Sequence, residues 1–232
     1  MNSYNNNLQK LPFSILDDYN NNKRLGLKNN FSLGSEILCA KFDKDDSLIA
    51  AGCLDGTLQI YHLQTGLLKN KFQTNQPGQS SNPVTCLRWR PSQINGIVKN
   101  LITTGDVNGN IVQWHASSGK ELERIIEPEN QILCLDYDKN GNYLATAGKD
   151  CIENGAYLFS AQFSKNNNDS ILVGGSGKNE AKLFESQDNF ETLGSVSNFN
   201  KGIFTVDYAN TSNKFLLGGG DGYLVVVSQV LK

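Results

Sequence analysis

The segment Ile37-Leu38-Cys39-Ala40-Lys41-Phe42 recurs four more times in this chain of 232 residues. In every copy an aliphatic residue takes the first place, a small residue the third and an aromatic residue the last. The later copies are VTCLRW at 84–89, ILCLDY at 132–137, LFSAQF at 158–163 and IFTVDY at 203–208. The copies begin 47, 48, 26 and 45 residues apart. A repeat period in the mid-forties is typical of a unit of four short strands.

Each copy opens the same order of short strands and turns. After a polar turn, a strand of small apolar residues is predicted at 48–52, 101–105, 144–148, 171–175 and 215–218. Tight hairpin turns are predicted where Asp or Asn precedes Gly, because these residues accept positive φ angles, at Asp55-Gly56, Asn108-Gly109 and Asp221-Gly222. Third strands are predicted at 57–61, 110–114, 181–184 and 223–227, and outer strands at 67–72 and 121–126. Since no segment has the helical period, the sequence predicts an all-β fold of four-stranded units.

The stretch Gly-Cys-Leu-Asp-Gly-Thr-Leu-Gln-Ile-Tyr at 52–61 and its counterparts at 105–114 and 218–227 carry a family resemblance. They resemble the WD-repeat β-propeller family, and the resemblance covers roughly residues 24–230. It implies a WD-repeat-type β-propeller with four complete four-stranded blades plus a half blade. The Asp that usually follows the third-strand Trp is replaced in this chain by His62, His115, Glu185 or Ser228.

The repeat breaks near residues 150–156. The third copy continues normally to Asp150, and the fourth copy follows so soon that no residues remain for the third and fourth strands of that blade. Three explanations stand: an internally truncated seven-bladed ring, a partial propeller completed by a partner, or a strained small ring. We expect an internally truncated seven-bladed ring, because the two ends of the chain have the strand pattern that closes such a ring. The last copy lacks an outer strand, and residues 24–28 are expected to supply it and close the ring.

The sequence predicts two regions. Residues 1–23 are rich in Asn and other polar residues, so we expect a mobile N-terminal segment there, and residues 24–232 form the propeller domain. The formal net charge of −2 does not favour nucleic acid or an anionic membrane as a partner. The N-terminus has no signal-peptide pattern, and no apolar run is long enough for a transmembrane helix, so we expect a cytoplasmic protein.

The third place of the repeated segment is taken by Cys39, Cys86, Cys134, Ser160 and Thr205. A place that accepts Cys, Ser or Thr indicates small-residue packing rather than a metal site or a disulfide. The aromatic residue in the last place also recurs at one strand position. This recurrence favours packing between blades over a platform for stacking bases.

The sequence offers no catalytic set and no cofactor site. His62 and His115 are the only histidines, and each ends a third strand, so no Ser/His/Asp or Cys/His arrangement can be built. The glycine-rich run at 174–179 lacks the first Gly and the final Ser or Thr of a phosphate-binding loop. We therefore expect a non-enzymatic protein without cofactor, metal or small-molecule substrate. Its candidate contacts with a partner are Arg88, Arg90, His62 and His115.

The expected function is that of a scaffold for other proteins, because propellers present rigid rims to partners. Residues 157–164, 174–185 and 216–227 resemble a group of WD-repeat proteins from ciliated and flagellated protists. This resemblance implies a structural or assembly component of a cilium, an axoneme or a similar cytoskeletal complex. One alternative is a substrate-receptor subunit of a ubiquitin ligase, whose Trp-Asp-x-Arg motif is absent at 114–117. Another is a cytosolic adaptor in a different multiprotein assembly.

Overall fold

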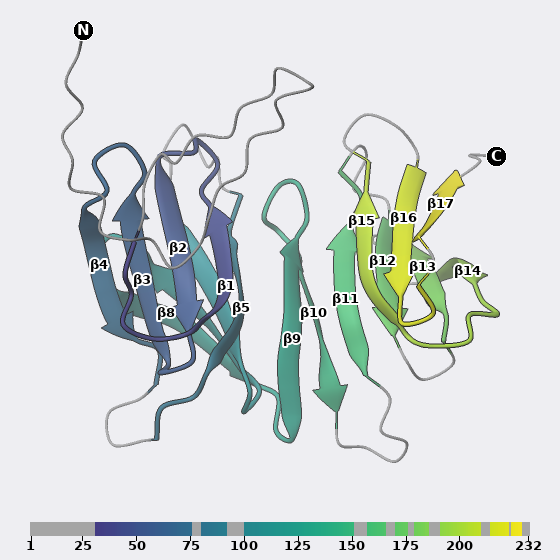
Figure 1. Cartoon of the computed structure of the whole chain (residues 1–232), viewed down its shortest axis with the longest axis horizontal. Coiled ribbons are helices and arrows are strands. Elements are labelled where there is room, and N and C mark those ends of the chain that lie inside the picture. The colour runs from purple at the N-terminus through teal and green to yellow at the C-terminus, as the bar shows by residue number, and fades with distance from the viewer. Residues whose placement is uncertain are drawn as a thin grey trace, which may run out of the picture. The chain divides into compact units, whose positions relative to one another are not determined.

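The computed structural model confirms the all-β prediction. It describes residues 31–75, 80–91, 100–150, 157–165, 170–175, 179–185, 191–209, 214–222 and 224–228. Within these residues the chain forms seventeen β-strands and no helix, and all strands lie in one compact unit, Leu33–Lys232 (Figure 1). The described part of the chain therefore contains no helix that could span a membrane.

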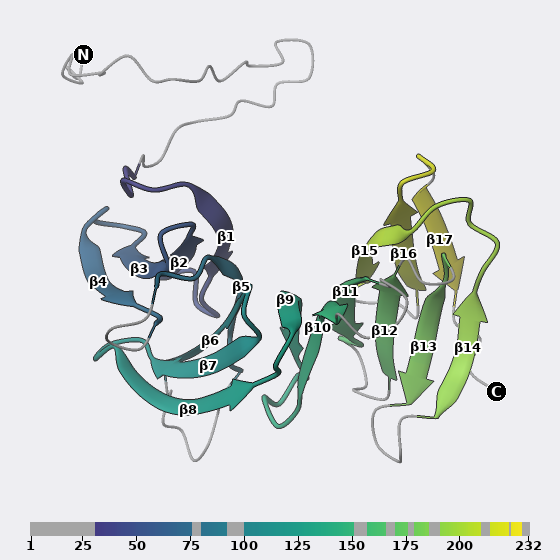
Figure 2. The ribbon, with the colours of Figure 1, turned by 90° about the horizontal axis from the view of Figure 1, so that it is seen from below.

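The strands form five antiparallel sheets in chain order, which we call blade 1, blade 2, the half blade, blade 4 and blade 5 (Figure 2). Blade 1 holds β1 (Ile37–Phe42), β2 (Leu48–Cys53), β3 (Thr57–His62) and β4 (Leu68–Gln73). Blade 2 holds β5 (Val84–Trp89), β6 (Leu101–Asp106), β7 (Asn110–His115) and β8 (Lys120–Ile126). The half blade holds β9 (Asn130–Tyr137) and β10 (Leu144–Asp150). Blade 4 holds β11 (Leu158–Phe163), β12 (Ser170–Gly175), β13 (Ala181–Glu185) and β14 (Thr192–Val196), and blade 5 holds β15 (Ile203–Tyr208), β16 (Lys214–Gly219) and β17 (Leu224–Ser228).

Within the described residues the half blade has two strands where blades 1, 2 and 4 have four. The break in the repeat near 150–156 stays a prediction, because residues 151–156 lie outside the described part of the chain. Blade 5 has three described strands. The predicted fourth, at 24–28, lies outside the described residues, so closure of the ring stays a prediction. The segment 1–23, Cys151 and part of the run at 174–179 also lie outside them.

The predicted turns are confirmed by backbone angles. Gly56, Gly109 and Gly222 have φ angles of 75°, 79° and 81°, a region in which side chains are strained. At Gly109 the need is also steric, because a Cβ there would collide with the backbone carbonyl oxygen of Glu127. Each glycine closes the hairpin between the second and third strands of its blade.

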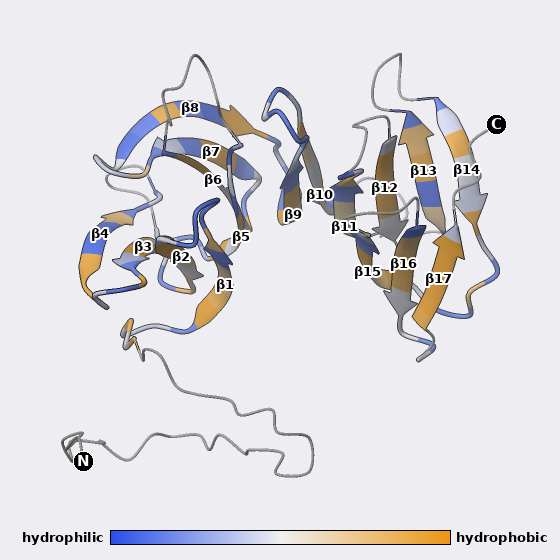
Figure 3. Cartoon of the chain, turned by 90° about the horizontal axis from the view of Figure 1, so that it is seen from above, coloured by the Kyte–Doolittle hydropathy of each residue, from blue (hydrophilic) through white to orange (hydrophobic). Residues whose placement is uncertain are grey.

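The core lies between neighbouring blades rather than inside one sheet. The first strand of each blade contacts the first strand of the next, from β1 and β5 through β9 and β11 to β15. Buried residues of blades 1 and 2 form one cluster, which includes Leu58, Ile60, Leu87, Ile102 and Trp114. A second cluster joins blades 4 and 5 through residues such as Leu183, Ile203 and Leu217. The outer strands β4 and β8 mix apolar and polar residues, whereas β17 is almost wholly apolar (Figure 3).

Candidate functional site

The small third residue of the repeated segment links each blade to the next. The thiol of Cys39 donates to the carbonyl oxygen of Val84 at 3.5 Å, and that of Cys134 donates to the carbonyl oxygen of Ala161 at 3.4 Å. In blade 4 the hydroxyl of Ser160 accepts the backbone N–H of Val206 at 3.3 Å. The four described cysteines are unpaired, and no group of side chains in the described residues could hold a metal. The packing interpretation of this place is confirmed, and hydrogen bonding adds to it.

The fifth residue of the segment forms a second row, which links neighbouring blades from blade 2 to blade 5 and which sequence reasoning missed. The residues in this place are Lys41, Arg88, Asp136, Gln162 and Asp207. Each is polar, which is the signal that could have revealed the row. The carboxylate of Asp136 lies 3.2 Å from Nε of Arg88, and Gln162 accepts the backbone N–H of Tyr208 at 3.1 Å. Burial raises the pKa of Asp136, and the positive charge of Arg88 lowers the pKa of Lys41.

The structure places the four candidate contacts in different surroundings. Arg88 is half-buried, and its guanidinium is bound by the carboxylate of Asp136 and the carbonyl oxygen of Leu87. His62 is exposed at the end of β3, and Nδ1 of His115 lies 2.8 Å from the hydroxyl of Ser118 at the end of β7. The two histidines thus sit at equivalent ends of separate blades. Contact of any of these residues with a partner stays a prediction.

Arg88 and Arg90 also border one shallow hollow. This hollow, of about 200 Å³, lies where β1 meets β5, and its basic side chains are Lys41, Lys44, Arg88 and Arg90. The indole of Trp89 forms part of its wall and donates to the carbonyl oxygen of Lys41 at 3.2 Å. The hollow is therefore basic and partly aromatic.

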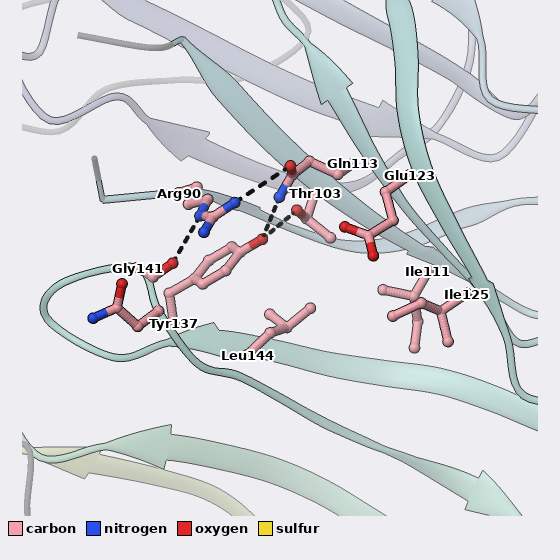
Figure 4. Close-up of a pocket in the computed structure, with 10 residues that line it drawn as sticks. Arg90, Thr103, Ile111, Gln113, Glu123, Ile125, Tyr137, Gly141 and Leu144 are labelled. Atoms are coloured by element: carbon pink, nitrogen blue, oxygen red, sulfur yellow. Dashed lines mark hydrogen bonds between the residues drawn. The ribbon is translucent and has the colours of Figure 1, made fainter. Parts of the chain in front are cut away.

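Arg90 reaches a second pocket, of about 150 Å³, between blade 2 and the half blade (Figure 4). Its Nε donates to the carbonyl oxygen of Gly141 at 2.7 Å, and its guanidinium carbon lies 5.9 Å from the centroid of the Tyr137 ring. The Tyr137 hydroxyl in turn lies 2.6 Å from the hydroxyl of Thr103 and accepts from the amide of Gln113 at 3.1 Å. These bonds hold the polar end of the pocket in one arrangement. They also confirm that the last aromatic residue of this copy packs against the preceding blade.

The other end of the pocket, which we call the half-blade groove, is apolar and open. Ile111, Ile125 and Leu144 line it, together with the carboxylate of Glu123 (Figure 4). Ile125 is 49% exposed although it lies on the face of blade 2 that points toward the half blade. The half blade contributes only β9 and β10 to the described structure, so it has no third strand to cover this face. The pocket as a whole thus combines rigid polar groups at one end with a half-exposed apolar side chain, Ile125, in the groove, as protein-binding surfaces do.

Two family models match the chain. Residues 20–92 match the model described as the Anaphase-promoting complex subunit 4 WD40 domain. Residues 119–152 match the model described as WD domain, G-beta repeat. The two matches fall on blade 1 with its flanking residues and on the junction of blade 2 with the half blade.

Curated relatives are distant and much longer. Over 118 residues, which are 51% of this chain and 9% of the relative, the chain is 25% identical to the Intraflagellar transport protein 122 homolog of Danio rerio. It is 27% identical to the Enhancer of mRNA-decapping protein 4 homolog of Drosophila melanogaster over 51% of this chain and 10% of the relative. It is also 27% identical to U3 small nucleolar RNA-associated protein 4 of Saccharomyces cerevisiae over 59% of this chain and 16% of the relative. The chain thus spans less than a fifth of the length of each of these proteins.

Proposed function

The chain belongs to the WD-repeat family of β-propeller proteins, and we propose that it is a non-enzymatic scaffold that binds other proteins. The observation that carries the proposal is the half-blade groove. Ile125 is half exposed in the groove, and the polar residues at the other end of the same pocket are fixed by hydrogen bonds, so a partner could bury Ile125 without reorganising them. The absence of enzymatic activity is proposed from the sequence, whose two histidines each end a third strand.

We further propose that the scaffold acts in the cytoplasm, in a cilium, an axoneme or a related cytoskeletal assembly. The similarity to an intraflagellar transport protein supports this setting. The similarities to a decapping enhancer and to a nucleolar RNA-associated protein would instead place the scaffold in other kinds of assembly. Localisation of the protein itself is therefore the decisive measurement.

The test is to express a tagged copy at native level in ciliated cells and to measure its amount in detergent-extracted axonemes and in its purified complexes. Enrichment in axonemes, together with a reproducible set of protein partners, would support both proposals. A diffuse copy that is absent from axonemes but retains partners would overturn the ciliary setting alone. Co-purification of a ligase core would favour the ubiquitin-ligase alternative. Failure to recover any partner would overturn the scaffold itself.

A further inference from the structure

The outer edge of β10 is the feature with an unassigned role. In blades 1, 2, 4 and 5 the second strand pairs with a first strand on one side and a third strand on the other. Within the described residues β10 pairs with β9 alone, apart from one bridge between Lys149 and Tyr157. An unpaired strand edge presents backbone N–H and C=O groups that can accept an added strand.

The register of the other blades defines what an added strand should carry. In blade 2, Trp114 lies opposite Ile102 and Val112 lies opposite Thr104 on the second strand. Both Trp114 and Val112 turn back into the core shared with blade 1. In blade 5 the third-strand residues Val227 and Val225 take the same two places and pack toward blade 4. A third strand of this fold thus carries two bulky apolar residues, two positions apart.

The equivalent places on β10 are Leu144 and Thr146. Leu144 lies opposite Tyr137, the last residue of its copy, as Ile102 lies opposite Trp89. Thr146, two residues farther on, then corresponds to Thr104. An added strand would therefore place its two apolar residues opposite Thr146 and Leu144.

The half-blade groove is the surface that these two residues would cover. At the junction of blades 1 and 2, the ring of Trp114 packs on Phe72 of β4 with 5.1 Å between centroids. Ile125 of β8 corresponds to Phe72, because Ile125 lies opposite Ile111 as Phe72 lies opposite Leu58. Ile125 is the half-exposed apolar residue of the groove. It lacks the cover that Trp114 gives to Phe72.

The charge in the groove adds a further requirement. Asn70 of β4 donates its amide to the carbonyl oxygen of Ala116, two residues beyond Trp114, at 3.1 Å. Glu123 takes the place of Asn70 in blade 2, since it lies opposite Gln113 as Asn70 lies opposite Ile60. A carboxylate can only accept hydrogen bonds. The added strand should therefore supply a donor, best a Lys or Arg, two residues beyond its second apolar residue.

A polar atom beside the edge fits the same occupant. In blade 2 the hydroxyl of Thr104 accepts the indole N–H of Trp114 at 2.9 Å, and Thr146 could accept a Trp in the same way.

We propose that an extended segment of a partner protein adds to β10 as the third strand of the half blade. The segment runs antiparallel to β10 and contains a motif of five residues. The first is a bulky apolar residue, the third is Trp or another bulky apolar residue, and the fifth is Lys or Arg. The second and fourth can be any residue. This proposal rests on the scaffold function and names the chemistry of its partner. Main-chain hydrogen bonds to β10 would provide the affinity for the segment, and the half-blade groove would provide the specificity.

The test uses the full chain and a fluorescein-labelled peptide with the sequence of residues 109–118, in which Ala116→Lys supplies the basic residue. Fluorescence anisotropy should show saturable, equimolar binding. In blade 2 the backbone N–H of Ala116 donates to Asn100 beside the second strand, so Val112, four residues earlier, faces the same edge. A peptide with Val112→Pro therefore loses an N–H that faces β10 and should lose binding, whereas Gln113→Pro alters the opposite edge and should bind more strongly than Val112→Pro. A peptide with Trp114→Asp should also fail to bind. Equal binding of all the peptides, or of none, would overturn the proposal.

Variants of the chain test the site itself. Ile125→Asp should weaken binding about tenfold or more, because it removes apolar area and places a charge beside the bound strand. Glu123→Lys should weaken it about threefold, as expected for a partly exposed ion pair, and a peptide with Ala116→Glu should restore it. Asp45→Lys, in an exposed turn of blade 1, is the matched control and should bind as the unchanged chain does. Circular dichroism of each variant shows whether the fold is kept, and loss of binding by Asp45→Lys would overturn the assignment of the site.

The same variants separate this inference from the scaffold proposal. If the Ile125→Asp chain keeps every partner of the unchanged chain in cells, strand addition is overturned while the scaffold stands. If Ile125→Asp converts a dimer to a monomer in solution, a second copy occupies the groove and the partner strand is overturned. If Ile125→Asp loses a subset of partners that Asp45→Lys keeps, the strand proposal is supported.

Discussion

The carboxylate of Asp136 accepts the backbone N–H of Phe163 at 3.0 Å, across the junction between the two-stranded half blade and blade 4. The two residues are the fifth and sixth of successive copies of the repeated segment. Gln162 makes the same bond to Tyr208 at the next junction. The links between first strands therefore continue through the half blade, because they depend on the first strands alone and not on the missing third and fourth strands.

Replacing Asp136 should test this link directly. Asp136→Ala is expected to lower the free energy of unfolding by about 1–3 kcal/mol, because the Phe163 N–H and the Arg88 guanidinium both lose their acceptor. Asp136→Asn keeps one acceptor oxygen and should cost less. Urea denaturation measures both, with Asp45→Ala as an exposed control expected within about 0.5 kcal/mol of the unchanged chain. Equal losses for Asp136→Ala and Asp45→Ala would contradict the role of the carboxylate.

The pH dependence of stability should carry the signature of Asp136. Burial raises its pKa above the value of about 3.9 in an unfolded chain, so the folded chain holds this proton more tightly. Its contribution to stability is then complete below that pH and is lost as the pH rises through the folded pKa. We expect the stability of the unchanged chain relative to Asp136→Asn to fall as the pH is raised through this range in urea denaturation. A relative stability that increases with pH would refute the sign.

The glycine at the end of each second strand should tolerate no side chain where the next blade packs on it. A Cβ at Gly105 would lie 2.6 Å from Cγ2 of Ile132 and 2.8 Å from Sγ of Cys86. Gly105→Ala is expected to lower the free energy of unfolding by about 1–3 kcal/mol through overpacking. Gly194→Ala is the control, because a Cβ there meets nothing within 4 Å. Thermal denaturation should therefore show a lower midpoint for Gly105→Ala alone.

The first residue of the repeated segment should contribute strongly to stability at the junction of blade 2 with the half blade and little at the junction of the half blade with blade 4. Ile132 is fully buried on Gly105 of the preceding blade, and Ile132→Ala should cost about 2–5 kcal/mol. Leu158 holds the same place in its copy but is 44% exposed, and Leu158→Ala should cost less than about 1 kcal/mol. The half blade has Ala147 opposite Cys134, where blade 2 has Gly105 opposite Cys86. Urea denaturation measures both losses of unfolding free energy. Similar losses for Ile132→Ala and Leu158→Ala would show that the two residues are packed equally well at their junctions.

Three cysteines, Cys39, Cys53 and Cys86, should be inert in the folded chain. Burial raises the pKa of Cys39 to about 12 and also raises the pKa of Cys86 and Cys53. Because the thiolate is the reactive form, iodoacetamide at about pH 8 should leave these three unmodified in the native protein. Peptide mass spectrometry should find all three modified once urea is added. Rapid native modification of Cys39 or Cys86 would contradict their burial.

Much of the fold could be predicted from the sequence. The five first strands, the hairpin glycines and the half blade follow from residue order, because strand alternation and positive φ angles are local properties. The small third residue was also correctly interpreted, since its recurrence reports on packing. The fifth residue was missed because its partners lie 27 to 48 residues away in the chain, as for Asp136 with Phe163 and with Arg88.

The site divides in the same way. The sequence by itself showed that too few residues follow Asp150 for two further strands of that blade, and it offered Arg90 as a candidate contact with a partner. Only the tertiary structure decided that the gap uncovers Ile125 and Glu123, and that Arg90 is held by Gly141 and Gln113 beside it. The physical reason is that a strand is specified by its own residues, whereas a groove is specified by the face of a neighbouring blade. That face comes from a different part of the chain.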